Sequence, residues 1–136
     1  MALKWSKKLT RSDAQQDTMG AKMPFLRFTK QKLPYDHKTW FRNEFFGKLA
    51  WEKSVSSYGK MIEKTKVPFH VVILGKDLGT RVMEVDHVPS RAENNSAPTT
   101  HLHYDNATRQ ALESQNLAGH SVVVECVDEK YFLSVL

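Results

Sequence analysis

Short strand-like segments separated by turn residues constrain the fold of this 136-residue chain more than any other feature. The apolar run 68–74 is followed by the turn Gly75-Lys76-Asp77-Leu78-Gly79 and by a second alternating segment at 80–88. Apolar residues at every second position suit a strand with one buried face, and a glycine-containing turn between two such strands is typical of a hairpin. The middle of the chain therefore predicts a β-hairpin.

Further strands are expected on both sides of this hairpin. The N-terminal region alternates weakly and predicts a polar hairpin, with strands at 4–10 and 25–29 and a long connection at 11–22 that has Gly20 as its flexible point. The segment 48–66 suits a strand, a loop or both. Towards the C-terminus, strands are expected at 99–104, 121–127 and 131–136, the last two joined by Asp128-Glu129-Lys130.

Two short helices complete the predicted elements. One begins at Asp36 and runs to about Phe46, with Gly47 after its end, and the other begins at Asp105 and runs to about Gln115. An Asp side chain accepts hydrogen bonds from the free amides of a first helical turn, and Gly is favoured just after a helix end. About seven strands and two short helices predict a mainly β fold, a seven-stranded open barrel, because curling a sheet removes exposed edges.

The length and the composition limit the class of protein. A chain of this size suits one domain over residues 1–136. The longest apolar run is too short for a spanning helix, and the N-terminus lacks the features of a secretory signal, so a cytoplasmic location is expected. The single cysteine, Cys126, cannot form an internal disulfide and is interpreted as a small core residue.

Charge is unevenly distributed along the chain. The net charge is +5, but residues 1–66 hold 15 Lys or Arg against 6 Asp or Glu, whereas residues 67–136 hold 5 against 9. A polyanion that contacts the N-terminal half explains this division, because Lys and Arg attract phosphates and release their counterions. Solubility explains it as well, so charge alone leaves the nucleic-acid interpretation and a general solvated surface both open.

The N-terminal third resembles a known DNA-binding module. Its pattern is Lys8-Leu9-Thr10-Arg11-Ser12-Asp13, then Gly20, Leu26-Arg27-Phe28, Leu33-Pro34 and the helix Trp40-Phe41-Arg42-Asn43-Glu44-Phe45-Phe46. This resembles the effector-binding N-terminal domain of EcoRII-type restriction endonucleases. That domain belongs to the DNA-binding pseudobarrel superfamily, with the plant B-three transcription factors and the DNA-binding domains of BfiI-like and NgoFVII-like endonucleases. The resemblance covers the whole chain in element order and is specific mainly in residues 1–46.

The resemblance implies that two arms project from the barrel and enter the major groove of duplex DNA from opposite sides. The N-terminal arm is residues 8–22, and the C-terminal arm is residues 88–100. Their side chains suit base reading, since Arg donates to guanine, Gln and Asn pair with adenine, and carboxylates accept from cytosine. The expected base-reading residues are Arg11, Ser12, Asp13, Gln15, Gln16 and Asp17 in the first arm, and Ser90, Arg91, Glu93, Asn94 and Asn95 in the second.

Phosphate contacts depend on charge more than on exact position. They are expected from Lys7, Lys8, Thr10, Lys22, Lys30, Lys32 and Lys38. The second arm departs from the family pattern, because Arg91 is its only basic residue and stands beside Glu93. The alternative for both arms is that these polar side chains are solvated loop residues with no reading role.

Histidine and acidic motifs leave an enzyme interpretation open. His101 and His103 lie two apart on a predicted strand and share a face, and Asp86-His87 ends another strand, so a small HNH-like metal nuclease using His87 and His103 is one alternative. The predicted second helix supplies no His or Cys ligand, which such a fold requires. A rim histidine that bonds backbone or phosphate is therefore favoured. Acidic-x-Lys tripeptides, the form found in metal-dependent restriction nucleases, occur at Asp36-His37-Lys38 and Asp128-Glu129-Lys130. The first stands at a predicted helix start and the second in a predicted turn, whereas that active site needs the pair on a strand.

Single-strand or RNA binding is another alternative, in which exposed Trp5, Trp51 and Tyr58 stack on bases. The favoured prediction is a sequence-specific duplex-DNA recognition domain of a type II restriction endonuclease, DNA-associated in a prokaryotic cytoplasm, with no catalytic residue or metal ligand of its own. Cleavage is expected in another domain or subunit, and the chain is expected to be an N-terminal reader excised from a longer endonuclease. Binding is expected to need no cofactor, with Mg²⁺ required only by an attached nuclease, and no membrane partner or small-molecule substrate is expected.

Overall fold

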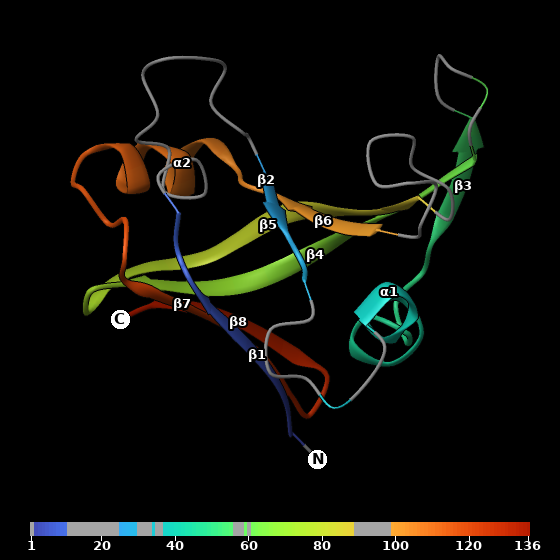
Figure 1. The fold of residues 1–136 in the computed structure, drawn as a ribbon, viewed down its shortest axis with the longest axis horizontal. Helices are drawn as coiled ribbons and strands as arrows, with labels where there is room; N and C mark the ends of the chain where they lie inside the picture. Colours follow the sequence, from blue (N-terminus) through green and yellow to red (C-terminus); the bar gives the residue numbers. More distant parts are fainter. Residues whose placement is uncertain are drawn as a thin grey trace.

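The computed structural model describes residues 2–10, 25–29, 34, 37–55, 59, 61–88 and 99–136. They form a mainly β fold with two short helical segments, arranged as an open, strongly curled half-barrel (Figure 1). The elements in chain order are β1 (Ala2–Lys8), β2 (Phe25–Arg27), α1 (His37–Trp40), the π-helix η1 (Phe41–Phe45), β3 (Glu52–Val55), β4 (Met61–Ile73), β5 (Lys76–Val88), β6 (Thr99–His103), α2 (Asn106–Glu113), β7 (Ser121–Val127) and β8 (Lys130–Val135). Within this part of the chain, no helix is both long and apolar enough to cross a membrane.

One sheet contains all the strands of the described chain. Its order is β1-β7-β8-β4-β5-β6-β2, with β3 paired to β4 away from this path. β4 and β8 run parallel, and the other neighbours are antiparallel. The β4–β5 hairpin has 13 residues in each strand and joins the β7–β8 side of the sheet to the β6–β2 side. The β4–β5 hairpin is therefore the central element of the sheet.

This hairpin turns more tightly than the sequence predicts. Leu74 and Gly75 form the turn, with φ of 49° and 81°, and β5 begins directly after them. A two-residue turn with positive φ at both positions matches the right-handed twist of the flanking strands. Gly79, expected in the turn, has φ of 76° and lies instead at a bulge, where the register shifts between Val71 and Val72.

Aromatic packing joins the two end strands of the sheet. β1 and β2 stand at opposite ends of the strand order. Trp5 of β1 packs edge-on against Phe28, with ring centroids 5.0 Å apart, and against Phe41 at 5.8 Å. Its Nε1 donates a hydrogen bond to Thr29 O at 2.7 Å. Trp5 is only 2% exposed, so a large buried ring with a satisfied N–H holds the curled sheet together across its open side.

The α1–η1 segment supplies a cluster of aromatic side chains to the core. Phe41, Phe45 and Phe46 are almost fully buried, and the Tyr131 hydroxyl of β8 donates a hydrogen bond to Phe45 O at 2.7 Å. A helix is thus present where the sequence predicts one. Its second half is a π-helix, in which Phe46 N donates to Phe41 O at 2.8 Å.

Gly47 follows this helix, but for a different reason than the left-handed cap that the sequence suggests. A Cβ at this position would lie 2.0 Å from Asn43 O, so the close approach of the backbone requires glycine.

The second helix, α2, begins where the sequence predicts it. Asp105 caps α2, since its Oδ1 accepts from Thr108 N at 3.2 Å, and its Oδ2 accepts from Arg81 Nε at 2.7 Å. The cap therefore also ties α2 to β5.

The predicted N-terminal hairpin is wrong. β1 pairs with β7, with Trp5 opposite Val124, and β2 pairs with β6, with Leu26 opposite Leu102. Each strand has one apolar face, and alternation determines which face is buried without determining the partner. The strand count also differs from the predicted seven, because the ambiguous segment 48–66 contains β3 as well as the start of β4.

Truncation of Trp5 tests its closing role. We expect Trp5→Ala to lower the free energy of unfolding by about 3–5 kcal/mol, because it removes a buried ring and the donor to Thr29 O. Lys4→Ala changes an exposed position on the same strand and should alter this free energy by less than about 0.5 kcal/mol. Urea unfolding followed by circular dichroism measures both. Similar small losses in the two variants would contradict the role assigned to Trp5.

Candidate functional site

The outward side of β5, β6 and β2 is polar, whereas the inward side is apolar. Val85, Leu102 and Leu26 point into the core and are fully buried. Side chains alternate along a strand, so the residues between them point outward. The register aligns these outward residues, with their β4 neighbours, in two rows: Lys64, Asp86, His101 and Arg27, then Lys66, Glu84, His103 and Phe25. We call the six members from β5, β6 and β2 the polar face: Phe25, Arg27, Glu84, Asp86, His101 and His103.

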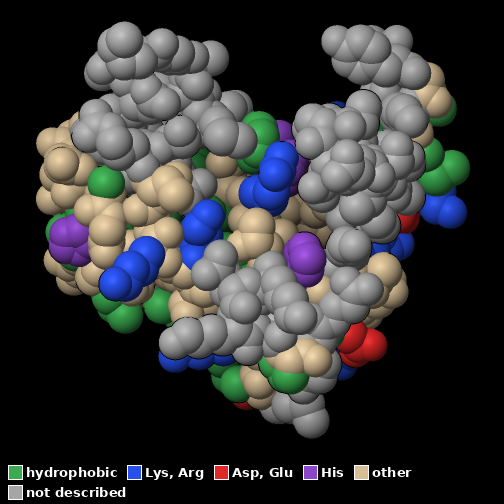
Figure 2. All heavy atoms as spheres, in the orientation of Figure 1, with side chains coloured by type: hydrophobic (Ala, Val, Ile, Leu, Met, Phe, Trp, Pro, Cys, Tyr) green, Lys and Arg blue, Asp and Glu red, His purple; other side chains and the backbone are tan. Residues whose placement is uncertain are grey.

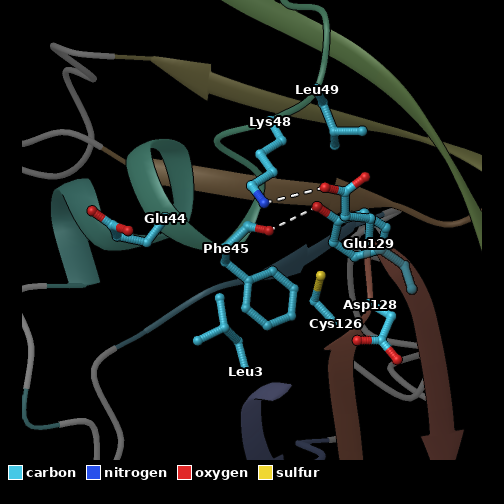
Figure 3. A pocket seen from close by; sticks show the side chains of 9 residues that line it. Leu3, Glu44, Phe45, Lys48, Leu49, Cys126, Asp128 and Glu129 are labelled. Atoms are coloured by element: carbon cyan, nitrogen blue, oxygen red, sulfur yellow. Dashed lines mark hydrogen bonds and ion pairs between the residues drawn. The ribbon is translucent and has the colours of Figure 1, made fainter. Parts of the chain in front are cut away.

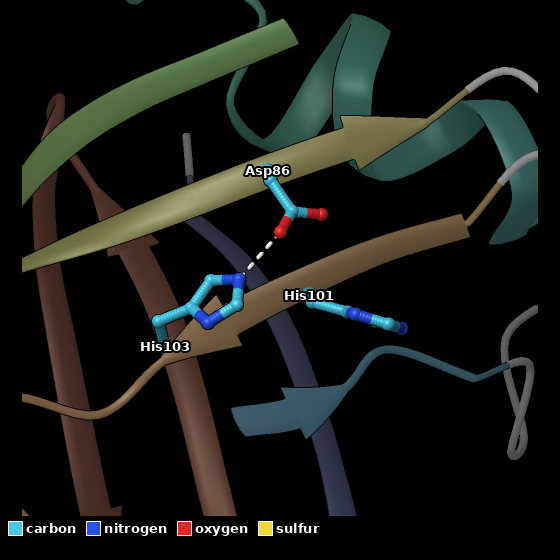
Figure 4. Close-up of side chains that lie close together, drawn as sticks. All are labelled: Asp86, His101 and His103. Atoms are coloured by element: carbon cyan, nitrogen blue, oxygen red, sulfur yellow. Dashed lines mark hydrogen bonds and ion pairs between the residues drawn. The ribbon is translucent and has the colours of Figure 1, made fainter. Parts of the chain in front are cut away.

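Asp86, His101 and His103 form a compact group on the polar face (Figure 4). Each offers one ligand atom, and these atoms lie within 4.8 Å of one another. His103 Nε2 forms a hydrogen bond with Asp86 Oδ2. Asp86 and His101 are buried, whereas the His103 side chain keeps 31% of its surface exposed. The group therefore combines two buried side chains with one that reaches solvent.

Phe25 covers the two histidines from the neighbouring strand. Its ring stacks on that of His101, with centroids 4.1 Å apart and planes at 9°, and lies 5.6 Å from the ring of His103. This contact contributes to the burial of His101 on an outward side of the sheet. It also restricts the orientation of the His101 ring.

The sequence predicts part of this group. The expectation that His101 and His103 share a face is correct. The HNH-like pairing of His87 with His103 is wrong, because His87 points to the opposite side of β5 and its Nδ1 bonds Thr100 Oγ1 at 2.8 Å. Asp86, expected only as a companion of His87, joins the other two histidines through the cross-strand register. That register is a tertiary property with no local signal in the sequence.

The aromatic residues expected to stack on single-stranded bases are not presented for that role. Trp5 is buried in the core. Trp51 is partly buried, its Nε1 donates to Phe46 O at 3.0 Å, and Arg42 lies 4.5 Å from its ring centroid. Tyr58 lies outside the described residues.

A partly buried ion pair lies on the inward side of the same sheet. Glu63 of β4 stands opposite His87 in the ladder, and Arg42 Nη2 donates to Glu63 Oε2 at 2.7 Å. The Arg42 hydrogen bond and charge hold the pKa of Glu63 below its ordinary value of 4.5, against the opposing effect of burial. The pair therefore anchors η1 to the sheet and depends on an ionised carboxylate.

The predicted base-reading residues all lie outside the described chain: Arg11, Ser12, Asp13, Gln15, Gln16, Asp17, Ser90, Arg91, Glu93, Asn94 and Asn95. Among the predicted phosphate contacts, Lys8 and Thr10 are exposed, Lys7 is half-buried on β1, and Lys38 belongs to α1. Lys22, Lys30 and Lys32 also lie outside the described residues.

The structure includes the residues at which the chain rejoins the sheet after each predicted arm. The first returns at Phe25, which pairs with His103, and the second at Thr99, which pairs with Val88. His103 and Thr99 are the two ends of β6, so four residue steps of about 3.3 Å place Thr99 roughly 13 Å along the strand from the residue that pairs with Phe25. The polar face includes the first of these points, Phe25, and extends along β6 towards the second.

The surface in this region is basic in part. Figure 2 shows Lys and Arg side chains over the left and the upper centre of the viewed side, where acidic side chains are scarcely visible. Lys4 and Lys8 are exposed on β1, the strand from which the first arm departs.

A separate pocket of about 600 Å³ lies between η1, β1 and the β7–β8 turn (Figure 3). Its rim carries an ion pair between Lys48 Nζ and Glu129 Oε1 at 3.1 Å, and both side chains are largely exposed. Tyr131 lines it, but its hydroxyl already donates to Phe45 O, and burial raises the pKa of that hydroxyl. Since these polar groups bind one another rather than converge on a ligand, the polar face is the better candidate site.

Comparison with known proteins identifies no relative of this chain. No protein-family model matches the chain, and neither the curated proteins nor the solved structures give a match. The resemblance to the pseudobarrel superfamily therefore stays a prediction.

The Glu63–Arg42 pair predicts a specific acid sensitivity. A carboxyl whose pKa is lowered by folding stabilises the protein above its unfolded pKa and loses that contribution as the pH falls through its folded pKa. We expect Glu63→Gln to cost about 2 kcal/mol of unfolding free energy at pH 7, and to reduce the loss between pH 5 and more acidic conditions. Urea unfolding at a series of pH values measures this.

Glu129→Gln is the matched control, because it makes the same chemical change in an exposed ion pair and should alter the free energy by less than about 0.5 kcal/mol. Parallel pH profiles for Glu63→Gln and the unaltered chain would contradict the assignment.

Proposed function

We propose that this chain recognises duplex DNA sequence-specifically through two arms, residues 8–22 and 88–100. The described chain resumes at Phe25 beyond the first arm and at Thr99 near the end of the second. Cleavage is assigned to another domain or subunit, as in a type II restriction endonuclease of a prokaryotic cytoplasm. The chain is then a reader that positions a nuclease, and it needs no cofactor to bind.

The observation that carries the proposal is the placement of the two arm roots. Thr99 begins β6, and Phe25 of β2 pairs with His103 at the other end of β6, roughly 13 Å along that strand. The major groove of B-form DNA is about 12 Å wide, so two segments anchored at this separation suit one groove. A sheet strand between them fixes this separation, which base reading requires.

The charge distribution also supports the proposal of DNA recognition. The excess of basic residues lies in residues 1–66, and exposed Lys4 and Lys8 belong to the strand that leads into the first arm. Phosphate contacts of this kind fix the register of a protein on a duplex, whereas the arms supply contacts to the base edges. The curled sheet is also consistent with a barrel-like reader, although a fold alone does not define a function.

Arg11 provides the test of base reading. A duplex selected from a randomised pool at stated salt supplies the preferred site. We expect Arg11→Ala to reduce the ratio of specific to non-specific affinity by about 5- to 150-fold, because a bidentate contact to guanine contributes roughly 1–3 kcal/mol of discrimination. Arg11→Lys is the control: it keeps the charge and loses the planar fork, so non-specific affinity should persist while specificity falls. Fluorescence anisotropy measures both affinities, and unchanged specificity in Arg11→Ala would refute the assignment.

Lys8 provides the test of phosphate contact. We expect Lys8→Ala to weaken binding to all duplexes similarly and to reduce the slope of log affinity against log salt by about 1. Lys48→Ala removes the same charge beside the pocket and should leave the slope unchanged. Anisotropy titrations over several salt concentrations give the slopes. Equal slopes for the two variants would place the DNA elsewhere on the molecule.

Two further outcomes would overturn the proposal as a whole. Tighter binding of single-stranded than of duplex DNA would favour a single-strand module. Nicking of plasmid DNA by the pure chain with a divalent ion would assign catalysis to the chain itself.

A further inference from the structure

We infer that Asp86, His101 and His103 bind one divalent transition-metal ion such as Zn²⁺. The inference concerns the polar face itself and goes beyond the proposed DNA recognition. It does not depend on that proposal.

The donor set distinguishes between classes of metal. Two imidazole nitrogens and one carboxylate oxygen match the ligands that Zn²⁺ takes at about 2.0–2.2 Å, whereas Mg²⁺ and Ca²⁺ prefer oxygen throughout. Three protein ligands also leave the fourth position of a tetrahedral zinc site for water or another oxygen ligand. Such a site is open rather than purely structural.

The backbone already brings the three side chains together. Asp86 stands directly opposite His101 in the β5–β6 ladder, and His103 follows on the same side two residues along β6. Their ligand atoms lie within 4.8 Å of one another, and tetrahedral coordination requires separations of roughly 3.3 Å. The Asp86–His103 hydrogen bond therefore has to open while the wider separations contract. Rotation of the Asp86 and His103 side chains on fixed strands would supply this change.

Burial and packing favour a defined site. Asp86 and His101 are 7% and 2% exposed, so little water competes for their ligand atoms. The Phe25 ring stacked on His101 restricts that imidazole to one plane. His103 reaches the surface, so an ion can enter from its side and keep one coordination position open.

Neighbouring charges adjust the affinity in opposite directions. Glu84 is paired with His103 in the register and adds a carboxylate beside the group, whereas Arg27 and Lys64 continue the row of Asp86 and His101 on the adjacent strands. The two effects partly cancel. The affinity then depends mainly on the three ligands, and we expect a Kd of about 1 μM or tighter.

Metal titration of the full chain, prepared without a histidine tag, tests the inference. Zn²⁺ added to the chelator-treated protein should bind with a stoichiometry of one by isothermal titration calorimetry, and Co²⁺ should give the visible absorption of a tetrahedral complex. His103→Ala and Asp86→Asn should each weaken Zn²⁺ binding by more than about 100-fold, because loss of a direct ligand exceeds the 10- to 100-fold effect of losing an outer partner. Circular dichroism verifies that each variant is folded.

His70→Ala is the matched control. His70 and Asp77 form a similar pair, with Nε2 and Oδ2 2.9 Å apart, but both are exposed and His101 is not beside them. This variant should bind Zn²⁺ like the unaltered chain. A comparable loss in His70→Ala would locate the ion at the surface pair and overturn the inference.

A measurement on the unaltered chain keeps the inference falsifiable if a variant fails to fold. Imidazole ¹⁵N resonances of His101 and His103 should shift together on addition of one equivalent of Zn²⁺, while those of His70 and His120 stay in place. Absence of saturable binding at about 100 μM Zn²⁺, or shifts spread over all histidines, would overturn the site. Since no DNA is present, either result leaves the proposed DNA recognition to its own tests.

Discussion

The contact between Trp5 and the residues that follow β2 is the constraint on which the rest of the fold depends. A sheet with β1 at one end and β2 at the other has two edges to protect. The Trp5 ring packs on Phe28 and Phe41, and its Nε1 bonds Thr29 O, so the two edges meet through side chains rather than through a strand ladder. The same contact brings η1 over the core, because Phe41 belongs to that helix. Curl, closure and helix placement thus follow from one buried aromatic group.

The polar face is a consequence of this curl. β2 has three residues and pairs with β6, and Trp5 holds the two residues that follow β2. That position places Phe25 opposite His103 and Arg27 opposite His101, and it adds the cover that buries His101. The site is therefore assembled from three strands that the chain contributes at widely separated points. A strand pairing that differed by one residue would turn these side chains into the core.

Local signals in the sequence predict most of the elements and few of their partners. The Asp105 cap, the β7–β8 hairpin and the existence of the central hairpin are correctly predicted, because each depends on residues within a few positions of one another, but the turn of the central hairpin is Leu74-Gly75 rather than 75–79. The N-terminal hairpin fails, because alternation in 4–10 and 25–29 indicates a buried face and says nothing of β7 and β6. For the site, the shared face of His101 and His103 follows from their spacing. The contribution of Asp86 follows only from the β5–β6 register, which is a property of the folded sheet.

The two proposals are coupled through the charge of the polar face. Glu84 and Asp86 supply two negative charges and Arg27 one positive charge, and Lys64 and Lys66 of β4 continue the same two rows with two more positive charges. A phosphate backbone approaching these rows is attracted by the three cations and repelled by the two carboxylates, so the two effects largely cancel. A divalent ion held by Asp86, His101 and His103 adds positive charge and offers an open position to an oxygen ligand such as a phosphate. Metal binding and DNA binding would then strengthen each other by the same free energy, because linkage between two ligands is reciprocal.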